Sequence, residues 1–154
     1  ERGDGVAAQE AIKADPALRA RVERALAWLV EDGATATPAL LALLAALEAQ
    51  APLVIDMVEQ GLDNATQQAL MAHLRRRDMA TRPLFLMTRS SAILDLAAVG
   101  ASEAILFCPA NHSPPSLVAP YPGAPGYEAV ATCVASPEVR ERTAGVIAVR
   151  PQVA

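Results

Sequence analysis

Two acidic side chains flank a turn near the middle of the chain. Asp56 ends the apolar run of residues 53–56, and Asp63 follows a Gly-Leu pair a few residues later. An apolar run this short is typical of a buried strand. At the carboxyl end of a parallel strand, side chains face the ligand crevice of an open α/β sheet, where a carboxylate can hold magnesium. Asp56 is therefore a candidate magnesium ligand, and the alternative is that it only caps the turn after the strand.

The flanking sequence predicts the elements that would position Asp56. Residues 16–31 have apolar side chains at helical spacing, with Asp15 as a start signal and Gly33 as a stop. Residues 34–50 predict a buried Ala/Leu helix that is capped by Thr37. Further helices are predicted over 64–77, capped by Asp63 or Asn64, and over 91–100, and further buried strands over 83–88 and 103–108.

This alternation of strands and helices predicts an α/β fold, a mainly parallel sheet with flanking helices and a helix-rich N-terminal part. Residues 53–56, 84–87 and 104–108 are expected to be neighbouring strands of that sheet. With 154 residues, one domain is expected. We divide it into a helical segment over 1–50, an α/β core over 51–108, a Pro-rich loop over 109–126 and terminal elements over 127–154.

The terminal elements are predicted from short patterns. Residues 127–134 favour a strand, residues 136–145 a short helix and residues 146–151 a last strand. The loop before them is rich in proline, and either a surface connection or an interface would explain it.

Composition excludes several classes of protein. The net charge of -4 does not favour a nucleic-acid partner, which would need a basic face. We expect no membrane insertion, because no apolar run is long enough to span a bilayer. The two cysteines are too few for a disulfide framework, so a cytoplasmic location is expected. The chain starts at Glu1 without a methionine or a signal-peptide pattern, which suggests a fragment or a trimmed chain.

The stretch LVIDMVEQGLDNATQQALMAHL, residues 53–74, resembles the Walker-B and D-loop region of ATP-binding-cassette ATPases. In that family an apolar strand ends in Asp-Glu, a Leu-Asp pair follows a few residues later, and a helix comes next. Asp56 and the pair Leu62-Asp63 fit this spacing without a gap. By the same count the signature motif of the family falls on residues 32–36, and the helix after it corresponds to residues 38–50.

The next stretch, PLFLMTRSSAILDLA, is similar to the switch segment of the RecF-, SMC- and OLD-like branch of the same P-loop superfamily. There an apolar strand runs into Thr-His-Ser and an apolar helix. The matching residues here are Thr88, Ser90, Ile93, Leu94 and Asp95. The resemblance covers residues 32–108 and implies that Asp56, Asp63, Thr88 and Arg89 bind nucleotide, with Asp56 on magnesium.

Three departures from the family pattern affect the residues that the family uses for ATP hydrolysis. The position of the catalytic carboxylate holds Met57, which can neither accept a proton nor orient water. The switch histidine is replaced by Arg89, which stays charged and cannot exchange a proton. The chain also contains no G-x-x-x-x-G-K-[ST] phosphate loop. We therefore assign no catalytic residue and expect no ATP turnover by this chain alone.

These observations lead to three hypotheses of function. The first is a degenerate ATPase-like domain that binds a protein partner or a second copy of itself, and that binds ATP and magnesium only weakly. The second is an ATP-binding subunit or fragment whose phosphate loop lies outside this chain. The third is a structural α/β module without a ligand.

Several residues allow more than one role. An Arg89–Asp56 ion pair would fill the place of the magnesium ion if the site is a remnant. Glu59 could replace the lost acid, although a solvated loop glutamate is the simpler interpretation. Asp63 could cap its helix or face a dimer partner together with the Gly33 region.

Cys108, His112 and Cys133 could supply three zinc ligands, or Cys108 and His112 a nucleophile and its base. A structural zinc site needs four ligands, and no third group orients the Cys–His pair. Two buried thiols and a loop histidine are therefore the simpler interpretation. His73 and the run Arg75–Arg77 are expected on the surface of a helix near its C-terminus.

Overall fold

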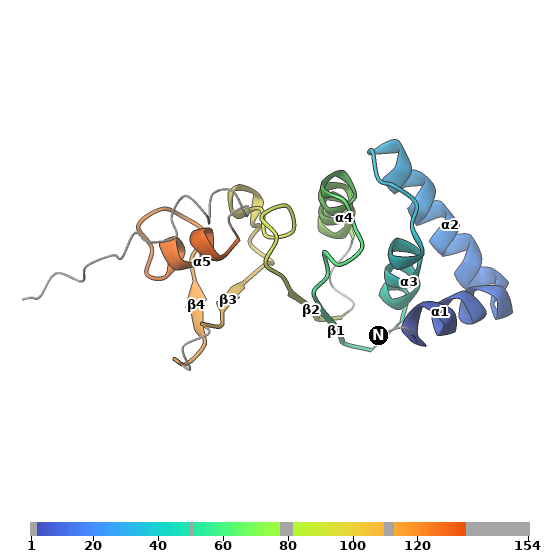
Figure 1. Cartoon of the computed structure of the whole chain (residues 1–154), viewed down its shortest axis with the longest axis horizontal. Helices are drawn as coiled ribbons and strands as arrows, with labels where there is room; N and C mark the ends of the chain where they lie inside the picture. The colour runs from blue at the N-terminus through green and yellow to red at the C-terminus, as the bar shows by residue number, and fades with distance from the viewer. Residues whose placement is uncertain (1–2, 50, 78–81, 110–112, 135–154) are drawn as a thin grey trace, which may run out of the picture. The chain divides into compact units, whose positions relative to one another are not determined.

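The computed structural model describes residues 3–49, 51–77, 82–109 and 113–134. It is an α/β structure with small sheets (Figure 1). In chain order its elements are α1 Gly3–Ala14, α2 Pro16–Glu31, α3 Pro38–Leu47, β1 Leu53–Asp56, α4 Asn64–Arg76, β2 Leu84–Met87, the 3-10 helix η2 Leu96–Ala98, β3 Ile105–Phe107, β4 Ser116–Val118 and α5 Tyr127–Cys133.

The chain divides into two compact units, Glu1–Asp95 and Leu96–Ala154. This boundary lies after Asp95 and not after residue 108, where the predicted α/β core ends. The organisation as one domain stays a prediction, and the two units are described separately.

The first unit is built on the helices α2, α3 and α4. The Asp15 carboxylate accepts hydrogen bonds from the backbone N–H groups of Ala17 and Leu18, which confirms the predicted start of α2. At the other end, Gly33 has φ +95°, and its N–H and that of Ala34 donate to the carbonyls of Val30 and Leu29. This pair of bonds is a Schellman motif, for which a left-handed glycine is favoured.

The start of α3 is also as predicted, because the Thr37 hydroxyl accepts a hydrogen bond from the backbone N–H of Leu40. Only one stripe of α3 is fully buried, formed by Leu40, Leu44 and Leu47, whereas burial nearly all round was expected. The buried stripe belongs to the core of the first unit. Its other fully enclosed members include Val22, Leu29, Leu70 and Ile93.

The sheet of the first unit has two parallel strands, β1 and β2, with Leu53 opposite Leu84 and Asp56 opposite Met87. Leu53, Ile55, Leu84 and Leu86 point to one face and pack against the helical core. The alternate residues point to the other face and are exposed. The predicted pairing of these two strands is confirmed.

The prediction of a third strand in that sheet is wrong. β3 pairs with β4 in a separate antiparallel sheet, in which Ile105 lies opposite Val118. The partner strand comes from within residues 109–126, which were predicted to be a loop. A short strand that follows its neighbour closely in sequence can pair without a crossover helix.

Two more predictions fail, one in the second unit and one in a stretch that spans the division after Asp95. Residues 127–133 form α5, where a strand was predicted, and residues 91–100 contain turns and η2 in place of a regular helix. Residues 3–14 form α1, which lies within the predicted helical segment over 1–50 but was not predicted as an individual helix. The predicted elements at 136–145 and 146–151 lie outside the described residues.

Candidate functional site

The carboxyl end of β1 continues into a tight turn that returns the chain to α4. The backbone N–H of Val58 donates to the carbonyl of Met87, so contact with β2 extends past the last strand residue. Met57 has φ +52°, an uncommon conformation for a residue other than glycine. Gly61 has φ +77°, and a Cβ there would lie 3.1 Å from the Cβ of Ala39. The turn is therefore closely packed against the start of α3.

Asp56 lies where the sequence predicts it, at the carboxyl end of β1, and its side chain is exposed. Within the described residues its carboxylate forms neither an ion pair with Arg89 nor hydrogen bonds to the backbone of residues 58–63. The ion pair and the turn cap are thus both wrong for this structure. The carboxylate is left facing solvent on the open face of the sheet.

Glu59, and not Asp56, forms the hydrogen bonds to the segment that follows β2. Its Oε2 accepts a hydrogen bond from the Thr88 hydroxyl at 2.7 Å, and its Oε1 accepts one from the backbone N–H of Arg89 at 3.0 Å. The side chain is half-buried. The interpretation of Glu59 as a solvated loop residue is therefore wrong, because both carboxylate oxygens bind the segment after β2.

A chain of polar contacts continues from Thr88 to α4. The Thr88 hydroxyl accepts from the backbone N–H of Ser90, and the Ser90 hydroxyl donates to the amide oxygen of Gln67. The amide nitrogen of Gln67 donates to the carbonyl of Leu62 at 2.8 Å. The segment after β2 is thus held both to α4 and to the turn that precedes α4.

Asp63 caps α4 and also holds the loop before α3. Its Oδ1 accepts from the backbone N–H of Thr66 at 2.8 Å, and its Oδ2 accepts from the Thr35 hydroxyl at 2.7 Å. The buried Thr66 hydroxyl accepts from the backbone N–H of Thr35. Hydrogen bonds from Thr35 and Thr66 lower the pKa of Asp63 below its usual value near 3.8. Of the two roles considered for Asp63, the helix cap is confirmed.

No direct hydrogen bond or ion pair joins the four predicted site residues to one another within the described part of the chain, and their binding of nucleotide stays a prediction. Thr88 and Arg89 meet Glu59, Asp63 meets Thr35, and Asp56 contacts none of these side chains by a hydrogen bond or ion pair within the described part of the chain. Sequence reasoning missed the role of Glu59. Its position three residues beyond the end of a strand was the available signal.

Metal binding receives no support from clustering of ligands. In the described ranges, no group of three or more His, Cys, Asp or Glu side chains is arranged to hold a metal ion. Cys108 and Cys133 are both exposed, so the expectation of buried thiols is wrong. His112, the other member of the zinc hypothesis, lies outside the described residues.

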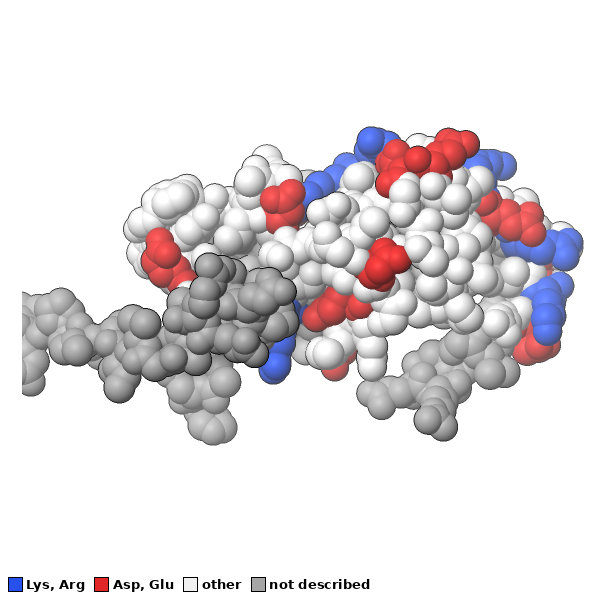
Figure 2. Space-filling model, turned by 45° about the horizontal axis from the view of Figure 1, so that its top comes forward, with Lys and Arg blue, Asp and Glu red and all other residues white. Residues whose placement is uncertain are grey.

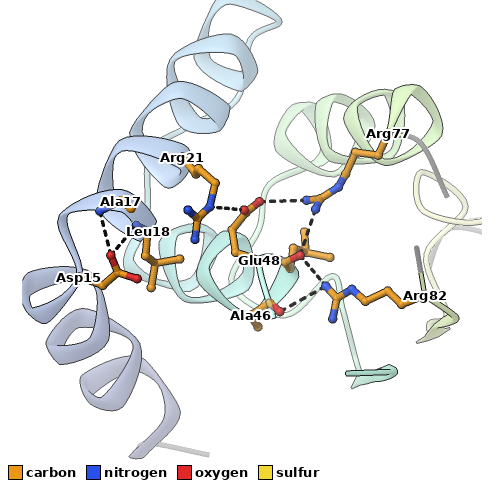
Figure 3. Close-up of polar contacts among 9 residues, drawn as sticks. Asp15, Ala17, Leu18, Arg21, Ala46, Glu48, Arg77 and Arg82 are labelled. Carbon is orange, nitrogen blue, oxygen red and sulfur yellow. Dashed lines mark hydrogen bonds and ion pairs between the residues drawn. The ribbon is translucent and has the colours of Figure 1, made fainter. Parts of the chain in front are cut away.

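The basic end of α4 is less solvated than predicted. His73 is half-buried, and its ring lies 5.4 Å from the ring of Trp28. Arg77 donates to the carbonyl of Leu47 at 3.0 Å and pairs with Glu48 (Figure 3). These contacts join the C-terminal ends of α3 and α4.

The surface carries charges of both signs. On the face shown in Figure 2, basic and acidic side chains lie next to one another and form no uniform basic patch. Among the helices described, none is long and apolar enough to cross a membrane. Comparison with protein-family models, curated proteins and solved structures found no match to the chain.

Proposed function

We propose that the chain is a degenerate ATPase-like domain that acts as a protein-binding or regulatory module and does not hydrolyse ATP. The absence of a phosphate loop from this sequence and the residues Met57 and Arg89 support this proposal. The internal hydrogen bonds of Glu59 and Asp63 support it further, because a carboxylate with both oxygens engaged is poorly placed to orient water.

The observation that carries the proposal is the exposed apolar face of the β1–β2 sheet. Val54 and Phe85 are register partners that point to this face, and they are 63% and 56% exposed. Met87, next along β2 on the same face, is 53% exposed. Parallel sheets are normally covered on both faces, and exposed apolar patches commonly mark interaction sites.

A second copy of this chain is the simplest partner for this face, and sedimentation velocity over a range of concentrations tests it. We expect reversible self-association that Phe85→Ser weakens, because the substitution removes an exposed aromatic ring from the patch. Val30→Ser is the matched control, since Val30 is a 47% exposed apolar residue on α2. A chain that stays monomeric at every concentration, or that both substitutions affect equally, would exclude association through this face.

The hydrolytic part of the proposal is tested by phosphate release from ATP in the presence of magnesium. Loss of one electrostatic element of an active site typically costs about 10²-fold or more in rate. We therefore expect turnover at background level for the purified chain and for Asp56→Asn alike. Magnesium-dependent release that Asp56→Asn abolishes would overturn the proposal.

The exposed Asp56 carboxylate favours a second candidate, an ATP-binding subunit or fragment whose phosphate loop lies on another segment or chain. In that case Asp56 would hold magnesium only when the phosphates are supplied from elsewhere. Calorimetric titration of the chain with ATP and magnesium, with Asp56→Asn as control, separates weak binding at Asp56 from no binding. If the chain neither self-associates nor binds ATP, the result would favour the third hypothesis, a structural module without a ligand. The cytoplasmic location inferred from the cysteine content stays a prediction.

A further inference from the structure

A groove of about 400 Å³ lies among α2, the end of α3 and the C-terminal part of α4. Its lining includes Trp28 and His73 and four arginines, Arg21, Arg24, Arg76 and Arg77. This volume is within the range of roughly 300–1,000 Å³ that is usual for small-molecule sites. All of these side chains belong to the first unit.

The groove concentrates positive charge in a chain whose net charge is negative. Glu48 is the one carboxylate in its lining, so four positive charges face one negative charge and leave an excess of three. Burial and the charge of Arg77 lower the pKa of His73, which keeps the imidazole neutral at pH 7. Such an excess in a concave surface attracts a multiply charged anion.

Two of the arginines are already engaged by protein groups. Arg21 Nε donates to Glu48 Oε2 at 2.7 Å, and Arg77 lies 3.5 Å from Glu48 Oε1 while it also donates to the carbonyl of Leu47 (Figure 3). Glu48 thus holds two guanidinium groups in place across the groove.

The other two arginines, Arg76 and Arg24, have side-chain N–H groups that form no hydrogen bond with the described residues. The guanidinium of Arg76 lies 4.3 Å from the centre of the Trp28 ring and 3.8 Å from the Asp32 carboxylate. Arg24 is exposed, and it forms no side-chain hydrogen bond or ion pair with any residue in the described ranges. The ring nitrogens of His73 likewise have no hydrogen-bond partner there.

We propose that this groove binds a small molecule through a diphosphate group. Planar guanidinium groups bind phosphate oxygens in pairs, and a group of two adjacent phosphates carries enough charge to balance the excess of the lining. Arg24 supplies a donor that has no side-chain partner among the described residues. Arg76, whose guanidinium lies over the Trp28 ring, supplies a second donor. The ion pair Arg21–Glu48 forms part of the lining between α2 and the end of α3.

Trp28 is the only tryptophan of the chain, so its fluorescence reports directly on the groove. Titration with inorganic pyrophosphate at constant ionic strength should give a saturable fluorescence change, and calorimetry under the same conditions should give the same affinity. Arg24→Gln should weaken binding by roughly tenfold, which corresponds to the loss of one charge-assisted hydrogen bond.

Arg19→Gln is the matched control, because Arg19 is an exposed arginine of the same helix outside the groove lining. Arg19→Gln removes the same charge as Arg24→Gln. The affinity for pyrophosphate should stay within about twofold of the original, a smaller change than the loss of a direct hydrogen bond would cause. Citrate, a carboxylate anion of similar charge, should bind more weakly than pyrophosphate. A nucleoside diphosphate that binds more tightly than pyrophosphate identifies an esterified ligand, and equal or weaker binding identifies an inorganic one.

The proposal is overturned if neither fluorescence nor calorimetry detects saturable binding of pyrophosphate. It is also overturned if Arg19→Gln weakens binding as much as Arg24→Gln, which would mean attraction by overall charge. Citrate binding as tightly as pyrophosphate would likewise exclude a phosphate-specific groove. Circular dichroism of both variants ensures that a change in affinity reflects the groove and not the fold.

Discussion

Both oxygens of the Glu59 carboxylate accept hydrogen bonds from the segment that follows β2. The turn after β1 and the start of the next segment are thereby held together by one side chain. Asp63 has an equivalent effect at the start of α4, where it binds Thr35 as well as its own helix. Glu59 and Asp63, and not Asp56, therefore form the side-chain hydrogen bonds that hold the segments around the carboxyl end of the sheet together.

Replacement of Glu59 with alanine should lower the free energy of unfolding by about 1 kcal/mol, the usual net contribution of such hydrogen bonds. The substitution leaves the Thr88 hydroxyl and the Arg89 N–H without their acceptor. Glu59→Gln keeps an acceptor oxygen and should cost less. Urea unfolding of both variants measures the difference, and equal stability of Glu59→Ala and the original chain would show that the bonds contribute nothing.

The lowered pKa of Asp63 predicts a dependence of stability on pH. Because the folded-state pKa lies below the unfolded-state value, ionised Asp63 stabilises the fold above the unfolded value, and this contribution is lost as pH falls through the folded value. In Asp63→Asn the side-chain amide oxygen can still cap the helix, but the side chain no longer ionises in this pH range. The difference in unfolding free energy between the two proteins should be largest at neutral pH and shrink below about pH 4.

Thr35→Val provides the control for this assignment, because the Thr35 hydroxyl is the main cause of the shift. In that variant the pKa of Asp63, measured by NMR titration of its carboxyl carbon, should move up toward the ordinary value. An unchanged pKa would assign the shift to Thr66 alone.

At the scale of elements, the start of α5 depends on close packing against β4. Gly126 precedes α5 with φ +82°, and a Cβ at this position would lie 2.9 Å from Cγ2 of Val118. Both the backbone conformation and the space therefore require glycine here.

Gly126→Ala should lower the stability of the second unit by about 1–2 kcal/mol, the cost of a left-handed conformation for an L-residue. Gly100→Ala is the control within the same unit, because its added Cβ would meet Glu103 Oε1 at an ordinary 3.6 Å. Chemical denaturation monitored by near-ultraviolet circular dichroism compares the two. A Gly100→Ala variant that is as destabilised as Gly126→Ala would refute the packing argument.

At the scale of the molecule, each unit has its own sheet, and the first unit depends mainly on its helices. Its two-stranded sheet is covered by the helical core on one face and is apolar and exposed on the other. Sheets of two strands are marginal by themselves, so the packing of α2, α3 and α4 must supply most of the stability.

Leu70 lies fully buried in α4 at the centre of that packing, together with Leu29, Leu40 and Leu44. Leu70→Ala should reduce the free energy of unfolding by about 2–5 kcal/mol, from lost burial and the cavity it leaves. Val30→Ala, on the exposed side of α2, should change it by less than about 0.5 kcal/mol. Thermal unfolding followed by circular dichroism tests both, and similar midpoints for the two variants would contradict this core.

The sequence alone determined the features that depend on residues close together in the chain. The caps of α2 and α3 by Asp15 and Thr37 join groups only a few positions apart, and the apolar runs of β1 and β2 are visible as runs. The same holds for the stop of α2 at Gly33, because a left-handed glycine is a local requirement. For α4 the sequence left the cap open between Asp63 and Asn64, and the structure assigns it to Asp63.

Only the tertiary structure decided which distant segments meet. The choice of β4 and not β2 as the neighbour of β3, and of Glu59 and not Asp56 as the partner of Thr88, each depends on contacts between segments that sequence periodicity does not relate. A short apolar run satisfies its backbone equally well beside any compatible strand, and a carboxylate accepts from whichever donor the fold brings within reach. Local propensity cannot distinguish these alternatives, because their free energies differ only through packing of the whole unit.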